Sequence, residues 1–215
     1  MLKKGIFIVF EGPDKSGKST QAKILARELE KRGCSVLHTR EPGGTPFAED
    51  IRRILLDTSY DLAPLSELFL YEAARAQHTQ ETLLPALKSG KIVISERYVL
   101  ASLAYQGYGR GLSLKLVRSL NAAASGGLKP HLTVLIDVPV DSFSERMKGV
   151  SPDRLEKEGS AFRRRVREGY RKLSKTERNI FVVDGRGQIE EIHKKIISRI
   201  EKLIRSCGHI SYEII

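Results

Sequence analysis

IFIVFEGPDKSGKST, residues 6–20, joins a short apolar run to a glycine-containing loop and the start of a helix. The apolar run, residues 6–10, is too short for a helix and predicts one buried strand. The segment after it fits G-x-x-x-x-G-K-[ST], a loop whose backbone N–H groups bind phosphate oxygens. A chance glycine-rich turn would not need a strand before it and a helix after it. The stretch therefore predicts a nucleoside triphosphate site near the start of the chain.

The residue types in this loop match the parts of a triphosphate and its metal ion. Glycines permit the tight turn, Lys18 supplies a charge for the terminal phosphates, and Ser19 supplies a hydroxyl for Mg²⁺. The N-terminus of the following helix favours the same anion. We expect the triphosphate to bind along Gly12, Pro13, Asp14, Lys15, Ser16, Gly17, Lys18, Ser19 and Thr20.

Composition limits the class of protein. The 215 residues carry a formal net charge of +11, which suits anionic ligands, either nucleic acid or a phosphate site beneath a basic surface. We favour the second. The chain shows no apolar run near the roughly 18–20 residues needed to span a bilayer, and no signal peptide is visible. Cys34 and Cys207 have no paired spacing, so we expect reduced thiols and a cytoplasmic protein.

Apolar periodicity predicts an alternation of strands and helices along the chain. The expected strands are 6–10, 35–39, 92–95, 132–136 and 180–183, and the expected helices are 18–32, 46–56, 65–88 (bent near Pro85), 113–124, 140–147, one from about 163, and 190–205. This order predicts an α/β protein of the P-loop NTPase fold, with a five-stranded parallel sheet and helices on both faces. We expect a single domain over 1–215, with a short lid at 148–159 and a tail of no firm pattern at 206–215.

Three further groups of residues are candidates for a second ligand. Tyr71 and Arg75 stand four apart on one predicted helix, a spacing suited to gripping a planar base. A core tyrosine beside an arginine in a surface ion pair would give the same spacing, and periodicity alone favours that alternative. Ser102 and Gln106 form a second pair four apart. Glu96-Arg97 follows a predicted strand, and parallel sheets place ligands at the carboxyl ends of strands.

Five segments, in this order and at similar spacing, resemble the bacterial-type thymidylate kinases: FEGPDKSGKSTQ, TREPGGT, ELFLYEAARAQH, ERYVLASLAYQGYGRG and DRLE. The resemblance runs from about Ile6 to Leu203. Many unrelated enzymes share a phosphate loop, whereas REPGGT followed by SLAYQG is quite specific. The resemblance implies transfer of the γ-phosphate of ATP to dTMP, giving dTDP and ADP for dTTP synthesis. It also implies Mg²⁺ as the cofactor, ATP and dTMP as ligands and a homodimer as the usual assembly. From the residues themselves we expect no membrane partner and do not favour nucleic acid.

The resemblance assigns roles by motif. Lys18 would cradle the ATP phosphates, Arg97 would bridge the phosphates of the two substrates, and Arg146 would pack on adenine. Ser19 and Glu96 would hold Mg²⁺. The residues expected to contact dTMP are Asp14, Glu41, Arg52, Tyr71, Arg75, Arg97, Ser102 and Gln106. The residues expected to act in catalysis are Asp14, Lys15, Lys18, Arg97 and Arg154.

Within these roles, Tyr71 stands where the family has a stacking phenylalanine. Ser102 and Gln106 fall where the family reads the thymine edge. Asp14 falls where it has an acidic residue near the sugar and phosphate of the acceptor.

The sequence departs from the family pattern at three positions. Glu96 replaces an aspartate, Ala101 replaces a small polar residue, and Lys15 stands where many bacterial members have glycine. Negative charge on the phosphoryl group during transfer must be stabilised by a cation. We expect Lys15 and the lid residue Arg154 both to supply positive charge there, with the larger contribution from Arg154.

Two other functions stay open. One is a kinase for another nucleoside monophosphate. The other is a P-loop ATPase that binds nucleic acid, which the lack of aromatic residues within the basic runs disfavours.

Overall fold

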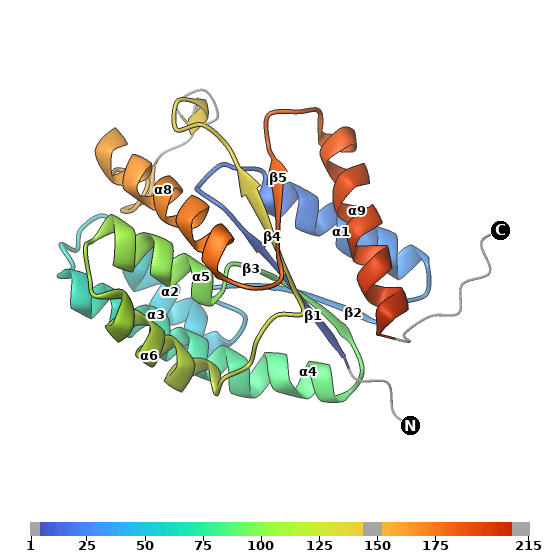
Figure 1. The fold of residues 1–215 in the computed structure, drawn as a ribbon. Helices are drawn as coiled ribbons and strands as arrows, with labels where there is room; N and C mark the ends of the chain where they lie inside the picture. Colours follow the sequence, from blue (N-terminus) through green and yellow to red (C-terminus); the bar gives the residue numbers. More distant parts are fainter. Residues whose placement is uncertain (1–4, 144–151, 208–215) are drawn as a thin grey trace.

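The computed structural model describes residues 5–143 and 152–207, and its centre is one parallel sheet of five strands in the order β2-β3-β1-β4-β5 (Figure 1). The strands are β1 (Ile6–Glu11), β2 (Val36–Arg40), β3 (Ile92–Glu96), β4 (Leu132–Asp137) and β5 (Ile180–Asp184). All five predicted strands are confirmed, with ends that differ by one residue. The predicted P-loop NTPase fold with a parallel sheet is confirmed as well.

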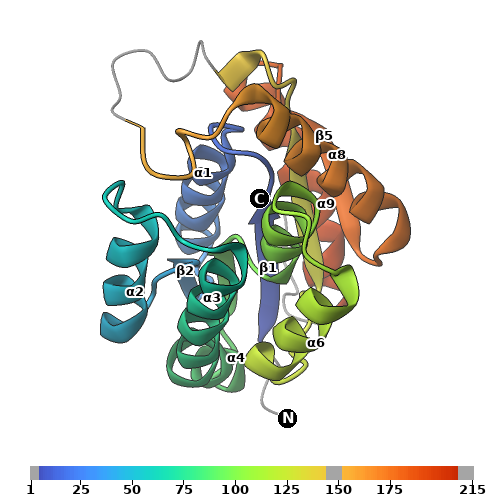
Figure 2. The same ribbon diagram turned by 90° about the vertical axis from the view of Figure 1, so that its left-hand side faces the viewer.

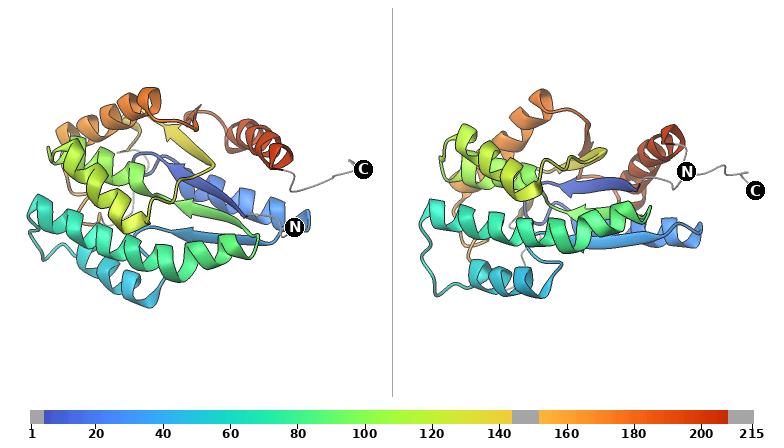
Figure 3. Two further views of the ribbon diagram at one scale, coloured as in Figure 1. Left: turned by 60° about the horizontal axis from the view of Figure 1, so that its bottom comes forward. Right: turned by 90° about the horizontal axis from the view of Figure 1, so that it is seen from below.

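Helices cover both faces of the sheet (Figures 1 and 3). The α-helices are α1 (Lys18–Lys31), α2 (Pro46–Leu56), α3 (Pro64–His78), α4 (Leu84–Lys88), α5 (Val99–Ser102), α6 (Leu114–Ser125), α8 (Ser160–Thr176) and α9 (Ile189–Ser206). Two π-helical segments are η1 (Thr79–Leu83) and η2 (Leu103–Gly109). Helices α1 and α9 pack on one face, and α3, α4, α6, η2 and α8 lie toward the other.

Side-chain alternation in β1 explains the two layers. Ile6, Ile8 and Phe10 point into the core under α1 and α9, whereas Phe7 and Val9 point into the core on the α4 side. All six residues of β1 are buried, as expected for the central strand of a parallel sheet. In α9, the isoleucines spaced four residues apart from 192 to 204 are all buried against the first face. The apolar pattern therefore sets which way each element turns.

The predicted helix over residues 65–88 requires a correction. It begins at Pro64 and is interrupted by η1 before it continues as α4. Pro85 has no backbone N–H, and its ring would clash with the carbonyl of Glu81 in a regular α-helix, so the turn ahead of it widens. The segment 101–111, given no regular structure from the sequence, is largely the π-helical η2. The second half of the helix predicted at 140–147, the first part of the predicted lid and most of the tail lie outside the described residues.

All five strands end at the same edge of the sheet, and each ends on a charged residue: Glu11, Arg40, Glu96, Asp137 and Asp184. Parallel register places Arg40 beside Glu96 and Asp137 beside Asp184. The phosphate loop follows β1 and lies at this edge, which brings Lys18 close to the strand-end carboxylates Glu11 and Glu96. Among the described residues, no helix is both long and apolar enough to cross a membrane.

Candidate active site

The backbone of the phosphate loop has conformations that only certain residues adopt. Gly12 has φ +143°, and a Cβ added there would lie 2.4 Å from the carbonyl oxygen of Ile136 in β4. Gly17 has φ +96° and directly precedes α1. Glycine is therefore required at residue 12 both by the backbone angle and by close packing on the neighbouring strand. These contacts bring the loop over the carboxyl end of the central strand.

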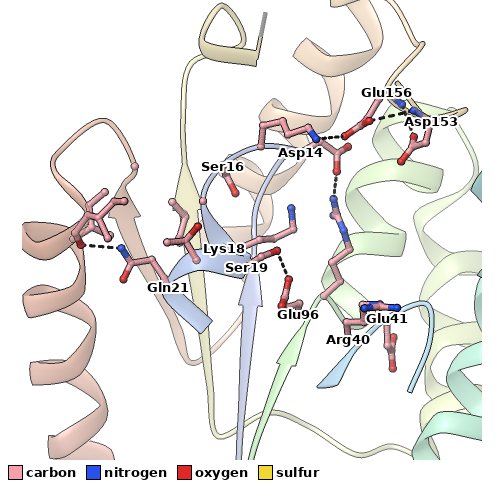
Figure 4. A pocket seen from close by; sticks show the side chains of 18 of the residues that line it. Asp14, Ser16, Lys18, Ser19, Gln21, Arg40, Glu41, Glu96, Asp153 and Glu156 are labelled. Carbon is pink, nitrogen blue, oxygen red and sulfur yellow. Dashed lines mark hydrogen bonds and ion pairs between the residues drawn. The ribbon is translucent and has the colours of Figure 1, made fainter. Parts of the chain in front are cut away.

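A cleft of about 660 Å³ opens above this loop. Residues 14–20 line it together with strand-end residues that include Glu96 and Arg97. Lys18 points into the cleft (Figure 4) and donates from Nζ to the carbonyl oxygen of Pro13 at 3.1 Å. Burial lowers the pKa of Lys18 to about 8, and Arg97 acts in the same direction. An anion in the cleft would supply the negative charge that Lys18 needs in this buried position.

Ser16 gives a second sign that the loop suits an anion. Its side chain is buried, lines the cleft, and has no hydrogen-bond partner for its Oγ among the described residues. A buried hydroxyl without a partner is costly unless a ligand or water satisfies it. A phosphate oxygen in the loop is the kind of group that would do so.

Oxygen donors meet on the other side of Lys18. The Ser19 hydroxyl donates to the Glu96 carboxylate (Figure 4), and the same carboxylate contacts His38 Nε2 at 3.0 Å. Burial acts to raise the pKa of Glu96, but the contacts with His38 and Ser19 hold this pKa below its usual value. The Glu96 carboxylate is therefore ionised. A hydroxyl and an ionised carboxylate are hard oxygen ligands of the type that Mg²⁺ prefers, and the longer side chain of glutamate still reaches Ser19.

A second cavity adjoins the cleft. All eight residues predicted to contact the acceptor line it: Asp14, Glu41, Arg52, Tyr71, Arg75, Arg97, Ser102 and Gln106. Five residues line both the cleft and the cavity, namely Asp14, Glu41, Arg52, Arg97 and Asp153. The two spaces therefore meet at a shared wall made mainly of charged side chains.

Arg97 is fixed at this junction by several contacts. It adopts φ +69°, which is uncommon outside glycine, directly after β3. Its guanidinium pairs with Asp14, donates to the Tyr105 hydroxyl at 3.1 Å, and lies 4.7 Å from the centre of the Tyr105 ring. The Tyr105 hydroxyl in turn donates to Asp14 at 2.7 Å. This closed set of contacts holds the guanidinium at the shared wall of the two cavities.

Arg75 is more deeply buried than either interpretation of the sequence predicted. Only 2% of it is exposed, and it pairs with Glu41 at 2.8 Å and with Glu72 at 2.7 Å. It also donates to the Ser102 hydroxyl at 3.0 Å. The alternative of a surface ion pair is therefore wrong. Arg75 is a buried cation at the wall of the second cavity, and Ser102 is joined to it.

The two other predicted cations both form ion pairs that involve the segment 152–159. Lys15 pairs with Glu156 at 3.0 Å. Arg154 pairs with Glu67 at 2.7 Å and donates from Nε to the Leu55 carbonyl oxygen at 2.8 Å. Asp153 and Glu156 are the members of this segment that line the cleft. Arg146 lies outside the described residues, and the catalytic roles of Lys15 and Arg154 stay predictions.

Sequence reasoning missed several residues of the site. Glu11, which ends β1, accepts hydrogen bonds from the Tyr98 N–H at 2.8 Å and from the Tyr170 hydroxyl at 2.9 Å. Tyr105 holds Arg97, as described above. Glu67 lies four residues before Tyr71 on α3 and binds Gln106. The four-residue spacing could have identified Glu67, whereas the partner of Glu11 on α8 is 159 positions away and left no local signal.

Taken together, the sheet, the phosphate loop and the two joined cavities define a P-loop nucleotide-binding protein with room for a second ligand beside the triphosphate. A family model described as thymidylate kinase matches residues 10–196. A protein named thymidylate kinase from Kosmotoga olearia is 45% identical over 206 residues, which are 95% of this chain and 99% of the relative. Another from Syntrophotalea carbinolica is 49% identical over 200 residues, 88% of this chain and 92% of the relative. The chain belongs to the thymidylate kinase family.

The substitution Glu11→Gln is expected to make the free energy of unfolding less dependent on pH. Burial raises the pKa of Glu11 from 4.5 to about 7, so between these values the folded chain keeps a proton that the unfolded chain releases. The stabilisation is complete below the unfolded pKa and is lost as the pH rises through the folded pKa, on the order of 3 kcal/mol in all. Glutamine can keep the hydrogen bonds.

Denaturant unfolding of both proteins from about pH 4.5 to about pH 8 measures this difference. The wild-type protein should lose stability relative to the variant across the range. Parallel pH curves for the two proteins would show that Glu11 titrates normally.

Proposed function

We infer that this chain transfers the γ-phosphate of ATP to dTMP, giving dTDP and ADP. The observation that carries this inference is the pair of adjoining cavities that meet at Asp14 and Arg97. Phosphoryl transfer needs two anionic nucleotides placed end to end, with cations where negative charge develops. Family membership supports the same reaction.

The chain's own residues would do this mainly by positioning and electrostatics. Lys18 and the loop backbone would bind the triphosphate, with the Ser16 hydroxyl as a further donor. Arg97 can contact phosphates in both cavities, because it lines both and Asp14 and Tyr105 prevent it from swinging away. Tyr71 at the wall of the second cavity offers an aromatic face to the base.

The donor set in the cleft fits a magnesium ion, and the proposal includes one. Ser19 and Glu96 would hold it, and Mg²⁺ in such sites commonly keeps waters and substrate phosphate oxygens as its other ligands. When bound, the ion neutralises charge on the phosphates. The protein contributes the hydroxyl, the carboxylate, and the contact from His38 that orients the carboxylate.

A homodimer is also part of the proposal. Large apolar side chains are exposed on three helices that lie on one side of the molecule (Figure 2), α2, α3 and α6: Phe47, Ile54, Leu65, Phe69 and Leu116. Phe69 is 52% exposed and Phe47 is 51% exposed. Several large exposed apolar side chains on neighbouring helices favour a protein interface there.

The reaction is tested by measuring ADP release with ATP and each of several monophosphates. We expect turnover with dTMP to be far faster than with CMP, AMP or GMP, because polar side chains such as Ser102 and Gln106 line the second cavity and would select the base. Equal rates with all four monophosphates would contradict a thymidylate-specific reaction and favour a kinase of broad base specificity. Strong, salt-sensitive binding to DNA without kinase activity would favour the nucleic-acid alternative.

The substitution Glu96→Gln should raise the Mg²⁺ concentration needed for half-maximal rate and lower turnover more than it raises the KM for dTMP. Glutamine keeps the size of the side chain but removes the charge that would attract the ion. Asp137→Asn is the matched control, since Asp137 ends β4 at the same edge of the sheet, is separated from β3 by β1, and pairs with Arg167 at 2.7 Å. Identical Mg²⁺ titrations for wild type and Glu96→Gln would mean that Glu96 is structural.

The substitution Phe69→Lys is expected to reduce the mass in solution to that of one chain, because a charge on the apolar surface would have to be buried in the interface. Light scattering measures the mass. Val182→Lys serves as the control, since Val182 is 48% exposed on β5 and belongs to none of the three helices α2, α3 and α6. A wild-type protein that is already monomeric would remove the dimer from the proposal.

A further inference from the structure

Glu67 is a fully buried carboxylate that binds Gln106, a wall residue of the second cavity, and two arginines. It lies on α3 and is 0% exposed. Its Oε1 accepts from Gln106 Nε2 at 2.8 Å and from Arg110 Nε at 3.2 Å. Its Oε2 accepts from Arg110 Nη2 at 3.0 Å and pairs with Arg154 Nη1 at 2.7 Å. One carboxylate thus meets two guanidinium groups and one amide, and none of these contacts requires a ligand.

The two guanidinium groups keep Glu67 ionised. Burial acts to raise the pKa of this carboxyl, but hydrogen bonds from Arg110 and Gln106 and the charge of Arg154 hold it below its usual value. An ionised carboxylate only accepts hydrogen bonds. The Gln106 amide must therefore turn its NH₂ group toward Glu67, because the reversed amide would press a carbonyl oxygen against a negative oxygen.

This orientation decides what Gln106 can offer to a ligand. Gln106 lines the second cavity. With its NH₂ group held by Glu67, the atom turned away from Glu67 is the carbonyl oxygen, a hydrogen-bond acceptor. Arg75, which lines the same cavity, has only donors. The wall thus combines a fixed acceptor with a fixed donor.

Such a pair discriminates between pyrimidines. Thymine presents the N3–H donor next to the O4 acceptor, which an acceptor and a donor on the protein complement. Cytosine presents the reverse, an N3 acceptor next to an N4 amino donor. A free glutamine amide could rotate by a half turn and accept either base, whereas a fixed amide cannot.

We propose that Glu67 sets the base specificity of the second cavity by locking the Gln106 amide with its carbonyl oxygen available to the base. Glu67 is therefore a positioning residue, which acts through Gln106 without touching the base. The proposal rests on the proposed function, in that the cavity holds the base of a nucleoside monophosphate.

The test is the ratio of kcat/KM for dTMP to kcat/KM for dCMP in wild type and in Glu67→Gln. A glutamine at residue 67 can either accept from or donate to Gln106, so the amide is free to take both orientations. We expect the ratio to fall at least about tenfold, the scale of one misplaced hydrogen bond in a buried site. The ratio does not depend on the fraction of folded enzyme, so lost stability alone cannot produce this result.

Two controls separate amide orientation from general disturbance. The dTMP to dUMP ratio should stay unchanged in Glu67→Gln, because uracil has the same N3–H and O4 edge and lacks only the 5-methyl group. The matched variant is Glu158→Gln, which removes the other carboxylate paired with Arg110 but does not contact Gln106. It should keep the wild-type dTMP to dCMP ratio.

The exchanged double variant Glu67→Gln/Gln106→Glu supplies a rescue. Its residue 106 is an acceptor-only carboxylate to which the new amide at residue 67 can donate, so most of the lost selectivity should return. A double variant as unselective as Glu67→Gln would assign the loss to disturbed packing and overturn the proposal. So would an unchanged dTMP to dCMP ratio in Glu67→Gln.

If Glu67→Gln does not fold, the double variant is compared directly with wild type, and a loss of selectivity greater than about tenfold overturns the proposal. A wild-type enzyme that does not prefer dTMP to dCMP would instead contradict the proposed function, before any variant is measured.

Discussion

The ion pair between Arg97 and Asp14 joins the two halves of the site, and the remaining geometry depends on it. Asp14 belongs to the loop after β1 and Arg97 follows β3, so the pair ties two neighbouring strand ends together above the sheet. The Arg97 N–H donates to the Phe10 carbonyl oxygen at 2.8 Å, which helps to hold the residue in its uncommon positive-φ conformation. The two side chains are 16% and 26% exposed, so water screens their attraction only in part, and the contacts of Tyr105 with both partners add to it. The Tyr105 hydroxyl accepts from Arg97 and donates to Asp14. It thereby holds both side chains at the wall that the cleft and the cavity share.

Local patterns in the sequence were enough to predict the sheet and most helices. An apolar strand and a four-residue helical repeat each bury one face, and short connections leave few possible topologies. The widened turns η1 and η2 could not be predicted, because they depend on how a helix accommodates Pro85 or packs against α8. Such adjustments follow from tertiary packing, which residue periodicity does not report.

In the site, too, local sequence patterns identified some residues and missed others. The residues expected at the second cavity were identified because family motifs and four-residue spacings mark them, and the structure brings all eight to one wall. The partners that orient those residues were not identified. Glu11 contacts Tyr170, which is 159 positions away, and Lys15 pairs with Glu156, which is also distant in the sequence. Only the folded chain reveals these two contacts. A motif records what touches a ligand, whereas the supporting carboxylates are specified by packing and charge balance.

The carboxylates differ in burial, and this difference determines how easily each paired cation can be drawn away. Lys15 and Glu156 form a pair whose side chains are 28% and 11% exposed, and a partly exposed pair contributes on the order of 1 kcal/mol or less. Arg154 pairs with Glu67, which is 0% exposed, and breaking a buried pair costs about 3–5 kcal/mol because a charge is left without a partner. A phosphate group can therefore draw Lys15 away from Glu156 more easily than Arg154 away from Glu67. The sequence favoured Arg154 as the larger source of charge for the transferring group. The two ion pairs differ in the opposite sense, since the Lys15–Glu156 pair is the easier of the two to break.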